Sequence, residues 1–235
     1  MPEFAKELAQ KNPEQIAIRD DKAALTWDDV DGILNRAINR LLETDLGPQK
    51  RISVFAENSN ETALAHLAGL LAGASTVPVN FHLTAEEAAY ILDVSSTCVL
   101  FLGPETLERG LEAARIAGVE KVIVWIDEKG ASSNFETWNT WHERASLEDP
   151  ITTGKPLPHL LYTSGTTGRP KGTDLPPTMF AGGDTIKDHI EALQESRFSK
   201  FGNHLVVGPM YHTRPLSGMR NLVAGDPVVV QGRYD

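Results

Sequence analysis

The residue types with the clearest chemical use lie between Leu160 and Gly172, where the chain reads Leu-Leu-Tyr-Thr-Ser-Gly-Thr-Thr-Gly-Arg-Pro-Lys-Gly. The apolar and aromatic residues at its start predict a short strand, and a run of hydroxyl residues and glycines follows. Glycines let backbone N–H groups approach an anion closely, and Lys171 adds a positive charge at the end of the loop. We therefore predict a loop that binds a polyphosphate, formed by Thr163, Ser164, Gly165, Thr166, Thr167, Gly168 and Lys171.

The loop differs from a P-loop in the residues around its lysine. A P-loop ends in Gly-Lys-Ser or Gly-Lys-Thr, whereas Pro170 precedes Lys171 here and Gly172 follows it. A kinase-like or GTPase-like phosphate site is therefore not expected. An ordinary Ser/Thr/Gly turn is the alternative, and it is disfavoured because hydroxyls, glycines and a lysine rarely occur together in this order.

Short apolar strands alternate with amphipathic helices ahead of the loop. Thr26 is a predicted N-cap with Asp29 three residues later, and the helix that follows carries an apolar stripe from Val30 to Leu42. Strands are expected at residues 16–20, 24–26, 52–56, 76–79, 98–102 and 121–126, and further helices at 3–11, 61–72, 85–92 and 105–117. This alternation is typical of an α/β domain whose largely parallel sheet is flanked by helices.

Residues 127–158 break this rhythm and predict a polar connecting segment with one short helix. We therefore expect a first α/β subdomain over residues 1–150, and the start of a second, with the phosphate loop, over residues 151–235. The tryptophans near the connector are expected to pack the subdomain edge rather than to stack on a ligand. They are Trp125, Trp138 and Trp141.

The composition limits the partners of the protein. With 235 residues and a net charge of −10, the chain can form one large or two modest domains. It lacks the basic excess that nucleic-acid binding requires, whereas ATP needs only a local positive site. Cys98 is the only cysteine, so no disulfide can form within the chain. Neither a signal-peptide pattern nor an apolar run of the ~20 residues needed to cross a membrane is present, so a cytoplasmic protein is expected.

Residues 160–172 resemble the signature loop of the adenylate-forming superfamily, which comprises acyl-CoA synthetases, luciferases and peptide-synthetase adenylation domains. Weaker similarities occur at residues 25–30, 69–80 and 83–92. The resemblance implies the N-terminal domain of this superfamily, with parallel-rich sheets flanked by helices. One departure follows Gly172, where relatives run Val-x-x-x-His or Asn and this chain reads Thr-Asp-Leu-Pro-Pro.

The segment from Gly208 to Leu216 resembles the Pro-x-x-His element of acyl-CoA synthetases, and His212 is the matching position. Without the resemblance, a lone histidine after a tyrosine is more often structural than functional. In relatives this element borders the acyl pocket, which implies that His212 is a substrate-binding residue. Arg214, where many relatives have a small residue, would narrow the pocket or bind an acidic group.

The resemblance implies two half-reactions without a covalent enzyme intermediate. A carboxylic acid, expected to be a fatty acid, attacks the α-phosphorus of ATP to give an acyl-adenylate and pyrophosphate. The thiol of coenzyme A then displaces AMP. It also implies that the loop cradles the β- and γ-phosphates, that Thr166 or Thr167 reaches Mg²⁺, with Thr166 the predicted ligand, and that Lys171 acts in catalysis. Three alternatives remain open: an acyl-AMP ligase that serves a carrier protein, a non-catalytic nucleotide- or acyl-binding fragment, and a half-enzyme that assembles with a second polypeptide.

The end of the chain departs from the family. Relatives are much longer and carry later elements for adenine, ribose, Mg²⁺ and a catalytic lysine, none of which can be located before Asp235. We therefore expect an incomplete domain that is inactive on its own. Its last apolar strand, Val228–Val230, would lack a neighbour and favour self-association.

Overall fold

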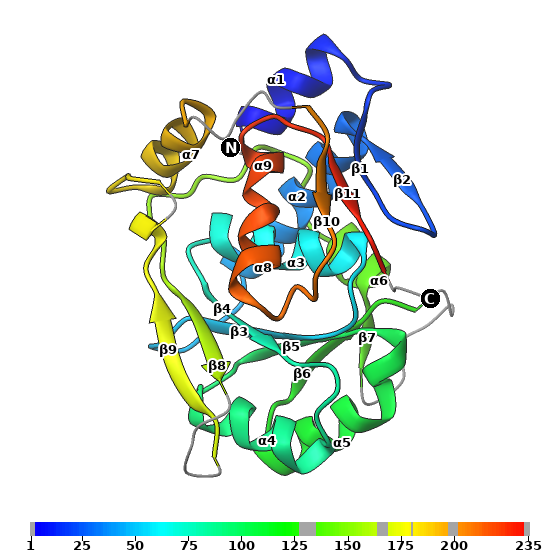
Figure 1. The fold of residues 1–235 in the computed structure, drawn as a ribbon, viewed down its shortest axis with the longest axis vertical. Coiled ribbons are helices and arrows are strands. Elements are labelled where there is room, and N and C mark those ends of the chain that lie inside the picture. Colours follow the sequence, from blue (N-terminus) through cyan, green and yellow to red (C-terminus); the bar gives the residue numbers. More distant parts are fainter. Residues whose placement is uncertain (1–2, 127–134, 164–168, 180, 197–201, 233–235) are drawn as a thin grey trace.

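The computed structural model describes residues 3–126, 135–163, 169–179, 181–196 and 202–232. Its strands form a five-stranded sheet, a four-stranded sheet and a two-stranded hairpin (Figure 1). Parallel strands flanked by helices confirm the predicted α/β fold class.

The five-stranded sheet is entirely parallel. Its strands lie in the order β4 (Ser75–Val79), β3 (Arg51–Phe55), β5 (Val99–Leu102), β6 (Lys121–Val124) and β7 (Glu136–Thr137). Because the strands run in one direction, their carboxyl ends meet at one edge of the sheet, where α/β proteins commonly bind ligands.

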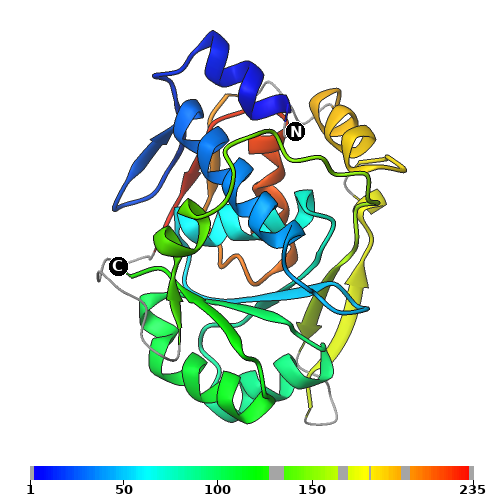
Figure 2. The same cartoon turned by 180° about the vertical axis from the view of Figure 1, so that it is seen from behind.

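Helices cover both faces of this sheet (Figure 1 and Figure 2). On one face lie α4 (Ala85–Val94) and α5 (Leu107–Ala117). On the other lie α2 (Trp27–Leu42), α3 (Asn60–Leu71) and α6 (Trp138–Glu143). Buried side chains of β5 alternate between the two cores: Val99 and Phe101 pack with α2 and α3, and Leu100 and Leu102 pack with α4 and α5. Such continuous burial is expected of a strand inside a parallel sheet.

The four-stranded sheet joins the two ends of the described chain. Its order is β10 (His204–Val206), β11 (Val228–Val230), β1 (Ile16–Arg19) and β2 (Ala24–Thr26). β11 pairs in parallel with both β10 and β1. The prediction that Val228–Val230 would lack a neighbour is therefore wrong, because one of its partners comes from the first 20 residues of the chain. The sheet thus takes strands from both sides of residue 150.

The remaining elements surround the two sheets. The hairpin consists of β8 (His159–Thr163) and β9 (Lys171–Leu175). The further helices are α1 (Glu3–Lys11), α7 (Ile186–Gln194), α8 (Thr213–Gly218) and α9 (Arg220–Val223), with short 3₁₀ turns at Pro104–Thr106 and Pro177–Met179. Within the described ranges, no helix combines the length and the apolar character needed to span a bilayer.

Local sequence signals account for several of these elements. The predicted N-cap of α2 is present as a capping box: the Asp29 N–H donates to Thr26 Oγ1 at 3.2 Å, and the Thr26 N–H donates to Asp29 Oδ2 at 2.8 Å. The packing role predicted for the tryptophans is also confirmed. All of them are buried around Phe101, with ring centroids 5.3 to 6.2 Å from its ring: Trp125, Trp138 and Trp141.

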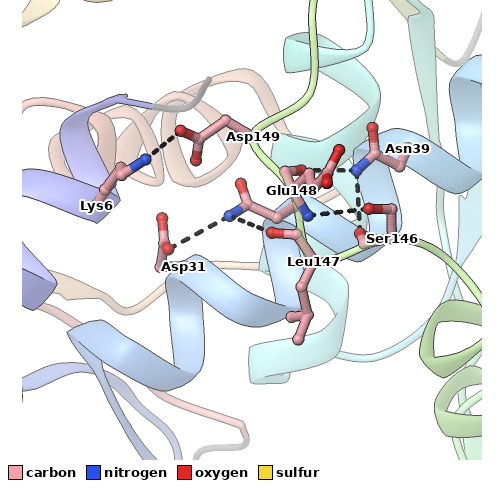
Figure 3. Close-up of polar contacts among 8 residues, drawn as sticks. Lys6, Asp31, Asn39, Ser146, Leu147, Glu148 and Asp149 are labelled. Atoms are coloured by element: carbon pink, nitrogen blue, oxygen red, sulfur yellow. Dashed lines mark hydrogen bonds and ion pairs between the residues drawn. The ribbon is translucent and has the colours of Figure 1, made fainter.

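Side chains of α1 and α2 hold the connector that follows α6 (Figure 3). Asn39 Nδ2 donates to the carbonyl oxygens of Ser146 at 3.0 Å and Glu148 at 2.9 Å. Lys6 of α1 forms an ion pair with Asp149. These contacts fasten a polar segment that has little apolar surface of its own to the side of α2.

Several histidines are buried in the interior of the protein, and the guanidinium group of Arg220 contacts one of them, His189. The rings of His66 and His159 are 6.4 Å apart, and His189 Nε2 accepts a hydrogen bond from Arg220 Nη1 at 3.0 Å. Burial lowers the pKa of His66 to about 3, and it lowers the pKa of His159 and of His189 below the ordinary value. All three imidazoles therefore resist protonation in the folded protein.

We expect acid to destabilise the fold through these histidines. Below about pH 6.5 the unfolded histidines bind protons that the folded ones do not, so the free energy of unfolding falls by up to about 1.4 kcal/mol per pH unit for each one. Asp31 acts in the opposite direction, because burial, followed by repulsion from Asp149, raises its pKa to about 6 from 3.8. Urea unfolding at several pH values between about 5 and 7.5 measures the sum of these contributions to the free energy of unfolding. In the His66→Leu variant, this free energy should change less with pH. If the free energy of unfolding changes with pH at the same slope in that variant, His66 does not contribute to the acid sensitivity.

Candidate functional site

The hairpin places the two described ends of the predicted phosphate loop side by side. β8 and β9 are antiparallel, and Thr163 lies directly opposite Lys171 in the register. Both residues are exposed. The rest of the predicted loop lies outside the described residues: Ser164, Gly165, Thr166, Thr167 and Gly168.

The hairpin is attached to the five-stranded sheet at its base. Ser75 Oγ of β4 donates to the Pro158 carbonyl oxygen at 2.7 Å, and Thr76 hydrogen-bonds His159 Nδ1. Arg51 of β3 lies 4.0 Å from an Asp174 carboxylate oxygen of β9. An isolated two-stranded hairpin is marginally stable at best, so these contacts are needed to fix its position.

His212 lies on a different element, immediately before α8. It is exposed, its backbone N–H donates to the Pro209 carbonyl oxygen at 3.0 Å, and its own carbonyl oxygen accepts from the Leu216 N–H at 3.0 Å. Its ring contacts that of Tyr211, with the centroids 4.4 Å apart. In the described part of the chain, no hydrogen bond or ion pair joins His212 to Thr163 or Lys171.

Aromatic rings continue from His212 to the segment between β4 and α4. The Tyr211 ring is 5.6 Å from the Phe81 ring and 6.4 Å from the His82 ring, edge to face in both cases. Phe81 and His82 are themselves 4.2 Å apart. The chain therefore builds a cluster of four rings from two segments that lie far apart in the sequence.

A cavity of about 470 Å³ opens beside these rings, and its lining includes Asn58, Phe81, His82, Pro209 and Gln231. These residues follow β3, β4, β10 and β11, whose carboxyl ends therefore converge on one space. The cavity lies where the carboxyl ends of the two sheets meet, which is the usual position of a ligand crevice in an α/β protein.

Asn58 is the residue that ties the two sheets together at this cavity. Its Nδ2 donates to the carbonyl oxygens of Gly208 at 2.9 Å and Gln231 at 3.0 Å, and its Oδ1 accepts from the Met210 N–H at 2.8 Å. Sequence reasoning missed this residue. The available signal was the polar run Glu57-Asn-Ser-Asn60 directly after a buried strand.

Glu57, beside Asn58, is a second group that the sequence reasoning missed. Its side chain is buried and approaches Gly103 so closely that a Cβ there would lie 2.2 Å from Glu57 Oε2. Burial raises the pKa of this carboxyl group. A glycine at position 103 therefore makes room for an acid at the edge of the sheet.

A larger cavity, of about 830 Å³, lies next to the first, and Val207 lines both. Its walls come from β10, α7, α8 and α9 and include Leu193, Val206, Arg214, Pro215 and Asn221. Its size suits an organic group of the size of a typical small-molecule ligand. His212 lies on the short segment between Pro209, which lines the smaller cavity, and Arg214, which lines the larger.

Comparisons with known proteins identify a matching family and several relatives. The profile of the family described as AMP-binding enzyme matches residues 5–212. Phosphinothricin tripeptide synthetase PhsB from Streptomyces viridochromogenes is 33% identical over 174 residues, which cover 73% of this chain and 14% of that protein.

Solved structures share the fold at low sequence identity. A protein assigned as a long-chain-fatty-acid CoA ligase from Rhodopseudomonas palustris superposes with a TM-score of 0.76 at 21% identity, covering 100% of this chain and 57% of that one. The anthranilate CoA ligase AuaEII, in complex with anthranoyl-AMP, gives a TM-score of 0.76 at 18% identity, covering 99% of this chain and 44% of that one. The chain thus spans well under two thirds of the length of these relatives.

Proposed function

Because the chain belongs to the family of AMP-binding enzymes, we propose that it supplies the phosphate loop and part of the acid-binding site of an enzyme that activates a carboxylic acid as its acyl-adenylate. The observation that carries this proposal is the hairpin, which sets Thr163 opposite Lys171 at the two ends of a Ser/Thr/Gly loop. Backbone N–H groups, hydroxyls and one lysine form a suitable cradle for a polyphosphate.

In the first half-reaction, a carboxylate oxygen attacks the α-phosphorus of ATP. The new bond joins that oxygen to phosphorus, and the bond to the pyrophosphate oxygen breaks, so pyrophosphate leaves with the electron pair. We propose that the loop residues Thr163, Ser164, Gly165, Thr166, Thr167 and Gly168, together with Lys171, hold the β- and γ-phosphates. Lys171 then stabilises the negative charge that grows on the departing pyrophosphate.

We propose that Mg²⁺ arrives with ATP and that the hydroxyl group of Thr166 contributes to its coordination. Hydroxyl and phosphate oxygens are hard donors that suit Mg²⁺, and bound Mg²⁺ would neutralise phosphate charge. Thr166 lies outside the described residues. Among the residues that the structure does describe, no cluster of histidine, cysteine and acidic side chains could hold a metal ion.

The acid is proposed to lie across the two cavities. Its carboxylate would occupy the smaller one, at the carboxyl ends of the strands, and its organic group the larger one, whose walls include Leu193, Val206 and Pro215. A fatty acid is the proposed substrate because these walls are largely apolar. In the second half-reaction the thiol of coenzyme A would attack the acyl carbon, releasing AMP and a proton.

Three assays test this proposal. The chain alone should bind a fluorescent ATP analogue in the presence of Mg²⁺, and tripolyphosphate should compete with it. Acid-dependent pyrophosphate release should need the chain together with the remaining part of a longer relative, because the chain is proposed to form only part of the active site. Comparing coenzyme A with a phosphopantetheinyl carrier protein as acceptor then decides the second half-reaction.

We expect His212→Ala to change the ranking of carboxylic acids while leaving the affinity for ATP nearly intact. The side chain is exposed beside Tyr211, and in sequence His212 lies between Pro209 and Arg214, each of which lines one of the two cavities. Pyrophosphate release measured with short, long and aromatic acids checks the ranking, and the melting temperature should not change. An equal loss for every acid, with a lower melting temperature, would instead indicate a structural histidine.

The subdomain boundary near residue 150 is also proposed, with residues 151–235 contributing the phosphate loop. Because residues 16–26 share a sheet with residues 204–230, the proposed boundary does not divide the chain into two separate sheets. It divides the chain by position in the sequence and by role in the site.

A further inference from the structure

One contact at the phosphate loop has no part in the proposed chemistry. The guanidinium group of Arg169 lies over the ring of Tyr90, 5.3 Å from its centroid. Arg169 is exposed and precedes Lys171 by two residues, so it belongs to the arm that carries the lysine. Tyr90 belongs to α4, outside the hairpin. An arginine over an aromatic face is attracted by the negative charge at the centre of the ring.

A second tyrosine, Tyr162, lies one residue before Thr163 at the loop end of the hairpin. Burial raises the pKa of Tyr162, a residue of β8, Arg51 opposes this rise, and Tyr90 adds to it. Gly172, opposite Tyr162 in the register, leaves room for the Tyr162 ring, since a Cβ there would lie 3.2 Å from Tyr162 Cζ. Tyr90 therefore contacts the hairpin through Arg169, and its electrostatic effect on Tyr162 agrees with this position.

The helix that carries Tyr90 is a firm support. Thr84 and Glu87 form a capping box at its start, and Arg109 Nη1 of α5 donates to the Leu83 carbonyl oxygen at 2.6 Å. Ala88, Ala89, Ile91 and Leu92 of α4 are buried against the five-stranded sheet. A ring carried by such a helix is held in place by the core of the protein.

The same short segment reaches the smaller cavity. Phe81 and His82, immediately before α4, line that cavity and contact Tyr211. Residues 81–90 thus contact the acid-binding side of the site at one end and the phosphate-binding arm at the other.

We propose that Tyr90 is a positioning residue for the phosphate loop. Its ring holds Arg169 and thereby fixes the position of Lys171 relative to the smaller cavity. This inference rests on the proposed function, because it assigns a partner to the loop that binds phosphate. Tyr90 itself does not touch the nucleotide. Its effect passes through Arg169 and the backbone of the arm.

The experiment measures binding of a fluorescent ATP analogue with Mg²⁺ to the 235-residue chain. Tyr90→Leu removes the aromatic face and Arg169→Gln removes the cation, and each should weaken binding by about 2- to 5-fold, the range expected of an exposed cation–π contact. The double variant should bind as weakly as either single variant, because both changes break the same contact. Tyr90→Phe keeps the ring and should bind like the unaltered chain.

A matched control accounts for the lost charge. Arg115→Gln removes an exposed arginine of α5 that pairs with Glu112, far from the hairpin in sequence, and should leave binding unchanged. Melting temperatures of all variants show whether Tyr90→Leu acts by loosening the core. If it does, its melting temperature falls together with its binding, whereas Tyr90→Phe keeps both.

Each other outcome decides against the inference. If Arg169→Gln weakens binding and Tyr90→Leu does not, Arg169 touches phosphate directly and the positioning role is wrong. If neither variant changes binding, the contact has no function. If the unaltered chain binds no nucleotide at all, the proposed function itself fails, and the role of Tyr90 fails with it.

Discussion

Replacing Lys171 by alanine is expected to lower the rate of acid-dependent pyrophosphate release by about 10- to 1000-fold, the range for removing one electrostatic stabiliser of a transition state. The lysine stands at the start of β9, opposite Thr163, with its side chain exposed at the end of the loop. In the proposed reaction, charge accumulates on pyrophosphate as the bond to the α-phosphorus breaks. The loss should therefore be larger in the rate than in the ground-state affinity for ATP.

The measurement requires the chain joined to the remaining part of a longer relative, with pyrophosphate release followed at saturating ATP. Lys187→Ala is a suitable control, because Lys187 is an exposed lysine of α7 that lies 3.9 Å from Glu191 and outside the hairpin. Lys171→Arg keeps the charge but changes its shape, and should recover part of the rate. A rate unaffected by Lys171→Ala would remove the residue from the proposed mechanism.

Asn58→Ala is expected to lower the free energy of unfolding by about 3 kcal/mol or more. The substitution removes three hydrogen bonds, one buried and two part-buried, and the loss of each costs about 1 kcal/mol or more. For a domain of this size, such a loss lowers the melting temperature by about 6–12 °C. The smaller cavity should also lose its shape, because Asn58 holds together the segments that line it.

Asn39→Ala provides a matched control for this prediction. Asn39 also donates to two carbonyl oxygens distant in sequence, but at the exposed side of α2. Water can replace its hydrogen bonds, so the expected loss is only about 1 kcal/mol. Thermal and urea unfolding of both variants give the comparison. Equal losses would show that burial at Asn58 does not set the cost.

Local patterns predicted the elements whose signals lie within a few residues. The cap formed by Thr26 and Asp29 and the strand expected at residues 98–102 both depend on neighbours in sequence. β9 gave no such signal, because Lys-Gly-Thr-Asp-Leu is polar and almost wholly exposed. The fold class followed from the order of the elements, which sequence patterns reveal well.

The arrangement of the site was harder to predict from the sequence than the fold class. The loop was found from its hydroxyls, glycines and lysine, which lie together in the sequence. The partner of β11 and the three hydrogen bonds of Asn58 involve segments at least 150 residues away. No local periodicity encodes such pairings, so they became visible only in the folded molecule.

The pairing of β1 with β11 also has a consequence for synthesis of the chain. Ile18 and Val228 are register partners, so the ribosome must add about 210 residues after the first strand before its parallel neighbour exists. At translation rates of about 5–20 residues per second, this takes about 10–40 s. During this time β1 has only β2 beside it, and a two-stranded ribbon is marginally stable in water. In the nascent chain, β1 therefore presents an open strand edge to chaperones while the five-stranded sheet forms after it.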